Sequence, residues 1–215
     1  MQEKNVFAKG EIFHVFNKSI ANFGIFKDSN NSMRFYRALS YYNSSSVKVN
    51  LGTFLKKSRD YHPKLLLPEK DSLIKMISYI FMSDHYHLLL KILKEKVFSK
   101  YMSDVENSYS RYFNIKFDRK GPLWQGRFKA VRIKTNEQLL HVSRYIHLNS
   151  TTAYLTEKPE EWIFSSYKEI ISNPIYLRKI LTEISFRTPT SYKKFVEDNI
   201  DYQRKLRVIK KLIID

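Results

Sequence analysis

The sequence predicts an α+β fold, a ferredoxin-like split sandwich with an antiparallel sheet, helices mainly on one face and a helical appendage at the C-terminus. Three observations support this prediction. Strand and helix patterns follow one another in the order strand, helix, paired strands, helix, strand, helix. A tight-turn signal between the paired strands makes them antiparallel. The chain has 215 residues, of which 43% are hydrophobic, so it can bury a core.

The first two elements are a strand and a helix. Aromatic and β-branched residues predict a strand over 11–16, which ends at a polar turn. Apolar residues recur at helical spacing over 28–42, where Asp28 or Ser29 can cap the start of a helix. The basic stretch 47–67 that follows has no clear pattern, and we assign no element to it.

The next elements complete the sandwich. Two apolar runs within 72–93 flank a polar turn at 82–84 and predict a hairpin. An amphipathic helix is expected over 97–113, and alternation of basic and apolar residues predicts a strand over 127–133. A helix then begins after Thr135.

The residue pattern of the chain changes after about residue 158. We expect a main domain over 1–158 and a basic helical extension over 159–215, where Pro and Trp residues punctuate two short helical patterns. The absence of cysteine excludes disulfide scaffolds, thiolate zinc sites and cysteine nucleophiles. No apolar run is long enough to span a membrane and the first residues lack a signal-peptide layout, so a cytoplasmic location is expected.

The net charge limits the class of partner. Lys and Arg number 38 against 21 Asp and Glu, which leaves a formal charge of +17. A surplus of this size attracts polyanions, because phosphate binding releases condensed counterions. With 15% aromatic residues available as stacking platforms, nucleic acid is the favoured partner, and a membrane partner is not expected. The plain alternatives are a cation-rich surface that serves only solubility and a protein that binds anionic membranes.

Two histidines mark a candidate metal site. His85 and His87 are two residues apart on a predicted strand, so both imidazoles project from one face of the sheet while Tyr86 points to the other. Two neutral imidazoles at this spacing can chelate a divalent ion. Taken alone, the pair is equally compatible with a partly buried polar contact.

The helix over 136–149 carries a second group of polar residues. Its capping-box signature is Thr135 followed by Gln138. One narrow polar face of the helix carries Gln138, His141, Tyr145 and Asn149. The adjoining apolar stripe carries Leu139, Val142 and Ile146. This arrangement places Tyr145 at the margin of the core with Asn149 one turn later. An ordinary interfacial tyrosine has the same pattern.

Several segments of the chain resemble a known family. FMSDHYHLLL is similar to the histidine-hydrophobic-histidine (HUH) motif of single-tyrosine transposases. YSRYFN, GPLWQGRFKA and YIHLN resemble the REP-associated, insertion-sequence-like branch of these enzymes, as do GEIFHVFNKSIANFGIF and EWIFSSYKEI. The resemblance extends in order over about residues 9 to 170.

The resemblance implies roles for four residues. His85 and His87 would ligate Mg²⁺ or Mn²⁺, Tyr145 would be the nucleophile, and Asn149 a third ligand bearing an amide. The chain departs from the family at two positions: Asp84 stands where the family usually has Asn, and Asn149 is followed by Ser rather than Pro. These departures bear on metal preference and on the ligand role of Asn149.

Other tyrosines and cations complete the prediction. Tyr109 and Tyr112 are rival nucleophiles by residue type, and we expect them to be stacking or packing residues. Alternation suggests that Arg127 and Lys129 share a strand face. The candidate DNA contacts are Arg127, Lys129, Arg132, Trp124, Arg144 and Lys18. A core position for Trp124 and a solvated face for the cations are the plain alternatives.

The function that the resemblance implies is cleavage of single-stranded or hairpin DNA through a 5′-phosphotyrosine intermediate. A monomer and a homodimer both fit the sequence. One alternative is a nucleic-acid-binding protein derived from a transposase without catalytic activity. Another is a metal-dependent nuclease that uses water as its nucleophile.

Overall fold

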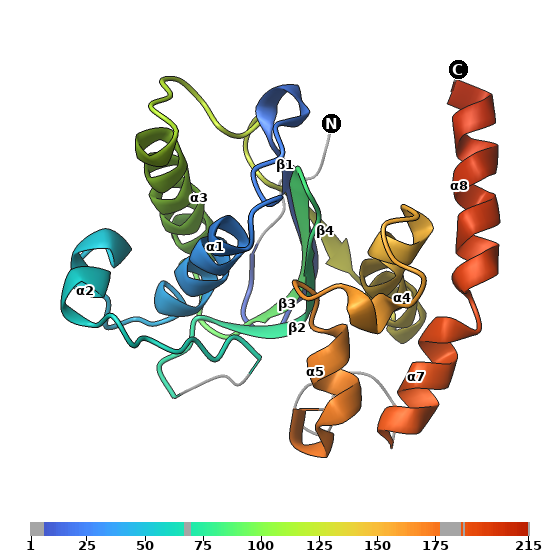
Figure 1. The fold of residues 1–215 in the computed structure, drawn as a ribbon. Helices are drawn as coiled ribbons and strands as arrows, with labels where there is room; N and C mark the ends of the chain where they lie inside the picture. Colours follow the sequence, from blue (N-terminus) through green and yellow to red (C-terminus); the bar gives the residue numbers. More distant parts are fainter. Residues whose placement is uncertain (1–6, 67–69, 177–185, 187, 215) are drawn as a thin grey trace, which may run out of the picture.

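The computed structural model describes residues 7–66, 70–176, 186 and 188–214, and its centre is a four-stranded sheet (Figure 1). The strands are β1 (Ile12–Lys18), β2 (Ile74–Phe81), β3 (His85–Ile92) and β4 (Lys129–Ile133). They lie in the order β2-β3-β1-β4 and every neighbouring pair is antiparallel, which confirms the predicted sheet. Residues 1–6 lie outside the described residues, and they include part of the N-terminal segment in which we expect no signal peptide.

Helices α1 (Ser29–Tyr41), α2 (Leu51–Lys57) and α3 (Phe98–Lys116) lie on one side of the sheet (Figure 1). The core fills the space beneath α1 and α3, where strand residues such as Val15 and Tyr86 are fully buried. Asp28 caps α1, as predicted, because its carboxylate accepts the Asn31 N–H at 3.0 Å.

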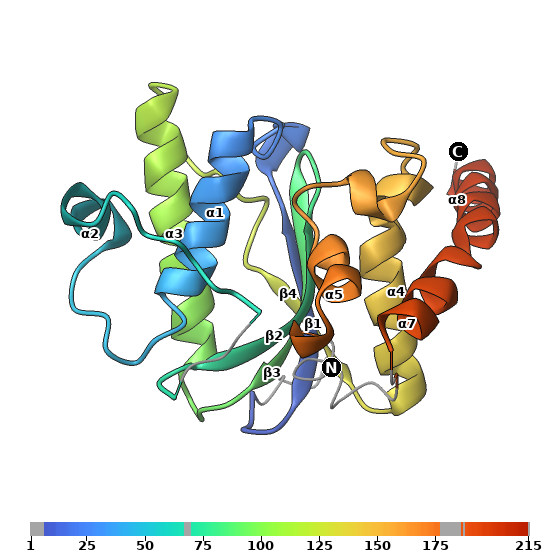
Figure 2. The same ribbon diagram turned by 60° about the horizontal axis from the view of Figure 1, so that its bottom comes forward.

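Helix α4 (Asn136–Thr152) covers the other face of the sheet, α5 (Tyr167–Ser172) lies on the same side next to β2, and α7 (Pro189–Glu197) and α8 (Ile200–Ile214) lie outside α4 (Figure 2). Helices mainly on one face were expected, and in this detail the prediction is corrected. The reason is the composition of the central strands. Seven of the eight residues of β2 are buried, and a sheet that is apolar on both faces needs helices on both.

Three short elements complete the fold. Helix α2 lies in the stretch that the sequence left unassigned, and Asn50 caps it by accepting the Thr53 N–H at 2.9 Å. Two 3₁₀ turns occupy Ile20–Asn22 and Pro159–Glu161. Within the described residues, no helix combines the length and apolar character needed to cross a bilayer.

Candidate functional site

The start of helix α4 is fixed by local hydrogen bonds. Thr135 Oγ1 accepts the Gln138 N–H at 3.1 Å, as the capping-box signature predicts. The Gln138 side chain accepts the N–H of Lys134 at 2.7 Å, one residue before the predicted position. Leu139 and Ile146 are buried toward the sheet, so the predicted apolar stripe seats the helix and turns Tyr145 toward β3.

Tyr145 lies beside the two histidines of β3. Its ring centroid is 5.4 Å from that of His87, with an angle of 79° between the rings. The ring centroids of His85 and His87 are 5.1 Å apart. The Tyr145 side chain remains 41% exposed, so a substrate can reach it. Residues that are about 60 positions apart in the sequence thus form one group, within a single chain.

The environment of the Tyr145 hydroxyl combines opposing influences. Burial raises its pKa, while a hydrogen bond with Asn149 and the positive charge of Arg207 lower it. Asn149 is therefore within reach of Tyr145, one turn along α4, as expected. Arg207 belongs to α8, and its guanidinium also donates to the Thr152 carbonyl at 2.7 Å. No local pattern in the sequence predicts that α8 approaches Tyr145.

Each histidine of the pair has a partner at Nδ1. His85 Nδ1 lies 2.6 Å from Asp84 Oδ1, and His87 Nδ1 lies 3.0 Å from Nε2 of His14. His14 belongs to β1 and sits diagonally across from His87 in the strand register. Sequence reasoning missed it, since only the β1–β3 pairing brings the two rings together. Orientation of a ligating imidazole through its second nitrogen is common at metal sites.

Burial keeps the imidazoles of His14 and His87 neutral. Burial lowers the pKa of His14 to about 4, and burial together with the charges of His14 and His85 holds the pKa of His87 well below its usual value. Burial would raise the pKa of Asp84, but the hydrogen bond to His85 and the charges of His85 and Lys18 hold it low. The carboxylate of Asp84 is thus ionised, and the neutral rings of His14 and His87 have lone pairs to offer.

The donor set fits a small divalent cation. His87 and the Asn149 amide both lie next to Tyr145, and His85 lies next to His87. Within the described ranges, no cluster of three or more His, Asp and Glu side chains is arranged to hold a metal. Asp84 is engaged with His85 and with Lys18 (3.4 Å), so it orients the ring. An ion bound by His85 and His87 would therefore need the Asn149 amide, together with substrate or water oxygens, to complete its coordination.

Two of the predicted DNA contacts lie on the same face as the histidines. Lys18 is the register partner of His85, and its ammonium is about half exposed. Lys129 pairs with Phe16, which in turn pairs with His87, so the exposed Lys129 side chain shares their face. Both cations therefore flank the candidate site.

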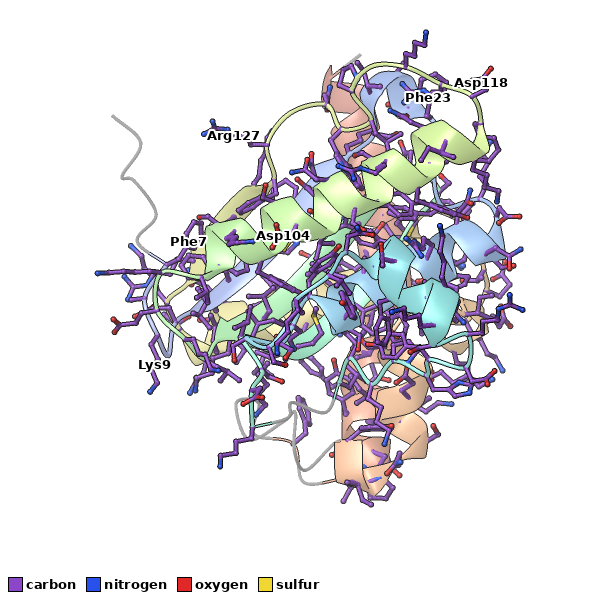
Figure 3. The ribbon with its side chains drawn as sticks, turned by 90° about the vertical axis from the view of Figure 1, so that its left-hand side faces the viewer. Phe7, Lys9, Phe23, Asp104, Asp118 and Arg127 are labelled. Atoms are coloured by element: carbon purple, nitrogen blue, oxygen red, sulfur yellow. The ribbon has the colours of Figure 1, made fainter. Side chains whose placement is uncertain are left out.

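Arg127 and Arg132 lie elsewhere. Strand β4 begins at Lys129, so Arg127 belongs to the preceding loop, from which it projects (Figure 3). The expectation that Arg127 and Lys129 share a strand face is thus wrong. Arg132 pairs with Phe13, on the α1–α3 side, and its guanidinium is bonded to both carboxylate oxygens of Glu11.

Trp124 and Arg144 are packing residues, which corrects two predicted DNA contacts. The Trp124 ring packs among the rings of Phe26, Phe35, Tyr86 and Tyr109. Its indole N–H donates to the Glu106 carbonyl at 3.3 Å. Arg144 is 9% exposed and lies over the Phe195 ring at 4.6 Å, beneath α7. The sequence could not predict that the C-terminal helices cover Arg144.

The same helices hold α4 through a buried polar chain. Tyr192 of α7 contacts Ser143 and also His147 Nδ1 at 2.8 Å. His147 Nε2 contacts Ser166 Oγ at 2.8 Å, and that hydroxyl accepts the Tyr79 N–H of β2 at 2.9 Å. Hydrogen bonds therefore link α7, the tyrosine-bearing helix and the sheet.

The rival tyrosines lie on α3, across the sheet. The Tyr109 hydroxyl donates to the Ile25 carbonyl at 2.7 Å, and the Tyr112 hydroxyl donates to Asn31 Oδ1 at 3.0 Å. Neither faces the histidines. Their placement agrees with the expected packing role.

Comparison with known proteins adds a family and a fold. Residues 64–149 match the family described as "Transposase IS200 like". No curated protein matches the sequence. The family resemblance predicted from the motifs is confirmed by this match, which includes His85, His87, Tyr145 and Asn149.

The chain is also similar to a solved REP-associated tyrosine transposase bound to a REP hairpin. The TM-score is 0.55 at 15% identity, over 80% of this chain and 86% of that one, and it supports the shared fold. A candidate transposase of Deinococcus radiodurans aligns with a TM-score of 0.37 and 12% identity over 68% of this chain and 95% of that one. A tRNA(His) guanylyltransferase of Saccharomyces cerevisiae gives 0.38 and 9% over 93% and 82%. Scores this low carry no further argument.

Proposed function

We propose that this chain, which carries an IS200-like transposase segment over residues 64–149, cleaves and rejoins single-stranded or hairpin DNA with Tyr145 as its nucleophile. The observation that carries the proposal is the 5.4 Å distance between the Tyr145 and His87 ring centroids. A nucleophile and a pair of cation ligands within one small site are what phosphoryl transfer requires.

The histidines are suited to ligation through Nε2. With its proton on Nδ1, His85 donates to Asp84 and His87 donates to His14, and each Nε2 then presents a lone pair. Asn149, whose amide is hydrogen-bonded with the Tyr145 hydroxyl, would supply its amide oxygen as a third ligand. A divalent ion bound there, Mg²⁺ or Mn²⁺, would polarise the scissile phosphate and offset the charge that develops in the transition state.

Transesterification then needs only the phenol. The Tyr145 oxygen attacks phosphorus and releases its proton to solvent, and the bond to the 3′-oxygen breaks. The products are a 5′-phosphotyrosine and a 3′-hydroxyl, which takes up a proton. One phosphodiester replaces another, so an incoming 3′-hydroxyl can reverse the step and join strands without ATP.

Lys18 and Lys129 support the substrate class. Both are exposed cations on the face of the sheet that carries His85 and His87. They would bind the phosphates next to the scissile bond, while the exposed surface of Tyr145 admits a flexible strand. A hairpin flanked by single strands meets both needs. The hairpin bound by the solved structural relative agrees with this substrate.

The test is trapping of the covalent adduct. Wild-type protein incubated with 5′- and 3′-labelled hairpin DNA and Mn²⁺ should give a protein–DNA band on a denaturing gel, and Tyr145→Phe should give none. Tyr112→Phe is the matched control and should keep the band.

The alternatives predict other results. An adduct that survives Tyr145→Phe contradicts the nucleophile assignment. Cut DNA without an adduct indicates a nuclease that uses water. Hairpin binding with neither product indicates a binding protein.

A further inference from the structure

A basic groove lies between α1, α2 and α3, on the side of the sheet opposite Tyr145. Figure 3 looks onto this side, with Asp104 labelled on α3. The groove has a volume of about 540 Å³ and its charged lining residues are Arg34, Arg111, Lys116 and Asp104. Asp104 is neutralised by Lys100 at 2.6 Å, so the groove is net positive.

Arg34 forms the most constrained part of the lining. Its guanidinium carbon lies 5.1 Å from the Tyr112 ring centroid, which holds the planar group in one orientation. Its Nε is buried without a hydrogen-bond partner in the part of the chain that the structure describes. Burial, with the nearby charge of Arg37, lowers the pKa of Arg34 although two tyrosines oppose the shift. A partly buried guanidinium without an acid beside it is stabilised when an anion joins it.

Further groups along the groove suit an anion. Arg111 is exposed one turn from Asn107 and Ser108, whose side chains are hydrogen-bond donors. The Lys116 ammonium at one end is held by Asn31 at 2.7 Å and is paired with Asp28 at 3.4 Å, so the positive charge of the groove comes from Arg34 and Arg111.

We infer that this groove binds a backbone phosphate of the DNA at a distance from the cleaved bond. The inference rests on the proposed function for its choice of nucleic acid, since free phosphate has the same chemistry. Arg34 would supply a planar fork for phosphate oxygens and Arg111 a second contact at the rim. Because α1–α3 and α4 lie on opposite faces of the sheet, the bound phosphate cannot be the one that Tyr145 attacks.

The experiment measures binding of a fluorescent hairpin DNA by anisotropy at several salt concentrations. Arg34→Gln and Arg111→Gln should each weaken binding about tenfold, and each should reduce the slope of log K against log salt by about 0.9. Arg59→Gln removes the same charge from an exposed position just beyond α2 and should change affinity less than about twofold. Unchanged affinity and slope in both groove variants would overturn the inference.

Two further arms separate the causes. Inorganic phosphate should raise the melting temperature of the wild type but not of Arg34→Gln. If it does so while hairpin affinity is unaffected by the substitutions, the groove binds free anion and the DNA assignment is wrong. The second arm measures adduct formation by the wild type on the same hairpin. If the wild type forms no adduct but the groove variants still lose hairpin binding, the proposed function is refuted and this inference stands. Arg111 is exposed, so its variant keeps the test valid if Arg34→Gln fails to fold.

Discussion

Helices α3 and α4 cover opposite faces of one sheet, and both carry tyrosines close to it. On α3, Tyr109 is fully buried and donates to a backbone carbonyl, and burial raises its pKa strongly. On α4, Tyr145 keeps much of its surface exposed, and its hydroxyl is beside Asn149 and the charge of Arg207. The strand side chains beneath the two helices differ as well, since Tyr86 faces α3 while His85 and His87 face α4. A tyrosine is a candidate nucleophile when its hydroxyl is accessible to substrate and lies next to possible metal ligands. Residue type alone does not distinguish the tyrosines of the two helices.

The largest expected effect concerns the histidines under α4. His87→Ala should reduce the rate of adduct formation by about 10³-fold, because a divalent ion contributes several kcal/mol to stabilising a phosphoryl-transfer transition state. Mn²⁺ binding by calorimetry should weaken in parallel. His141→Ala, an exposed histidine of the same helix, is the matched control and should change neither. If His87→Ala forms the adduct at the normal rate, the histidines of the α4 face take no part in the chemistry.

The sequence predicted the parts of this site that follow from periodicity within one element. The spacing of His85 and His87 on a strand, and of Tyr145 and Asn149 on a helix, placed each pair on a common face. The hairpin turn and the caps of α1 and α4 were local signals of the same kind. The family resemblance supplied the connection between the two pairs, which no local pattern contains.

Contacts between distant elements were beyond such reasoning. His14 meets His87 only through the register of β1 on β3. Arg144 looked like a surface cation because an isolated α4 would be amphipathic, whereas α7 covers its second side. Helix α2 was missed because its seven residues are too few to display a helical period.

A smaller effect tests the structural role of the α3 tyrosines. Tyr109→Phe leaves the buried Ile25 carbonyl without its donor and should lower the free energy of unfolding by about 1–3 kcal/mol. Adduct formation per folded molecule should be unchanged. Chemical denaturation measures the first quantity and a denaturing gel the second. If a folded Tyr109→Phe protein forms no adduct, the nucleophile lies on α3 and the assignment to α4 is wrong.

Buried ionisable groups on the two faces of the sheet should give stability a different dependence on pH. His147 of α4 is fully buried, and burial lowers its pKa to about 3. Between that value and about 6.5 the unfolded chain binds a proton that the folded chain does not, so stability falls as pH falls. One such group contributes about 1.4 kcal/mol per pH unit. His147→Gln should flatten the dependence by this amount between pH 6 and pH 4.5, and His141→Gln should not.

The buried acid of α3 should have the opposite sign and the smallest effect. Burial raises the pKa of Glu106 although Asn17 and Tyr86 donate hydrogen bonds to it. Just above about pH 4.3 the folded chain therefore keeps a proton that the unfolded chain has released, and this contribution to stability is lost as pH rises. Glu106→Gln accepts the same two hydrogen bonds and removes the titration, so stability should rise more steeply with pH than in the wild type. Urea unfolding at half-unit steps from pH 4.5 to pH 6 measures both slopes. Parallel curves for Glu106→Gln and His147→Gln would mean that the two faces do not differ in how they bury charge.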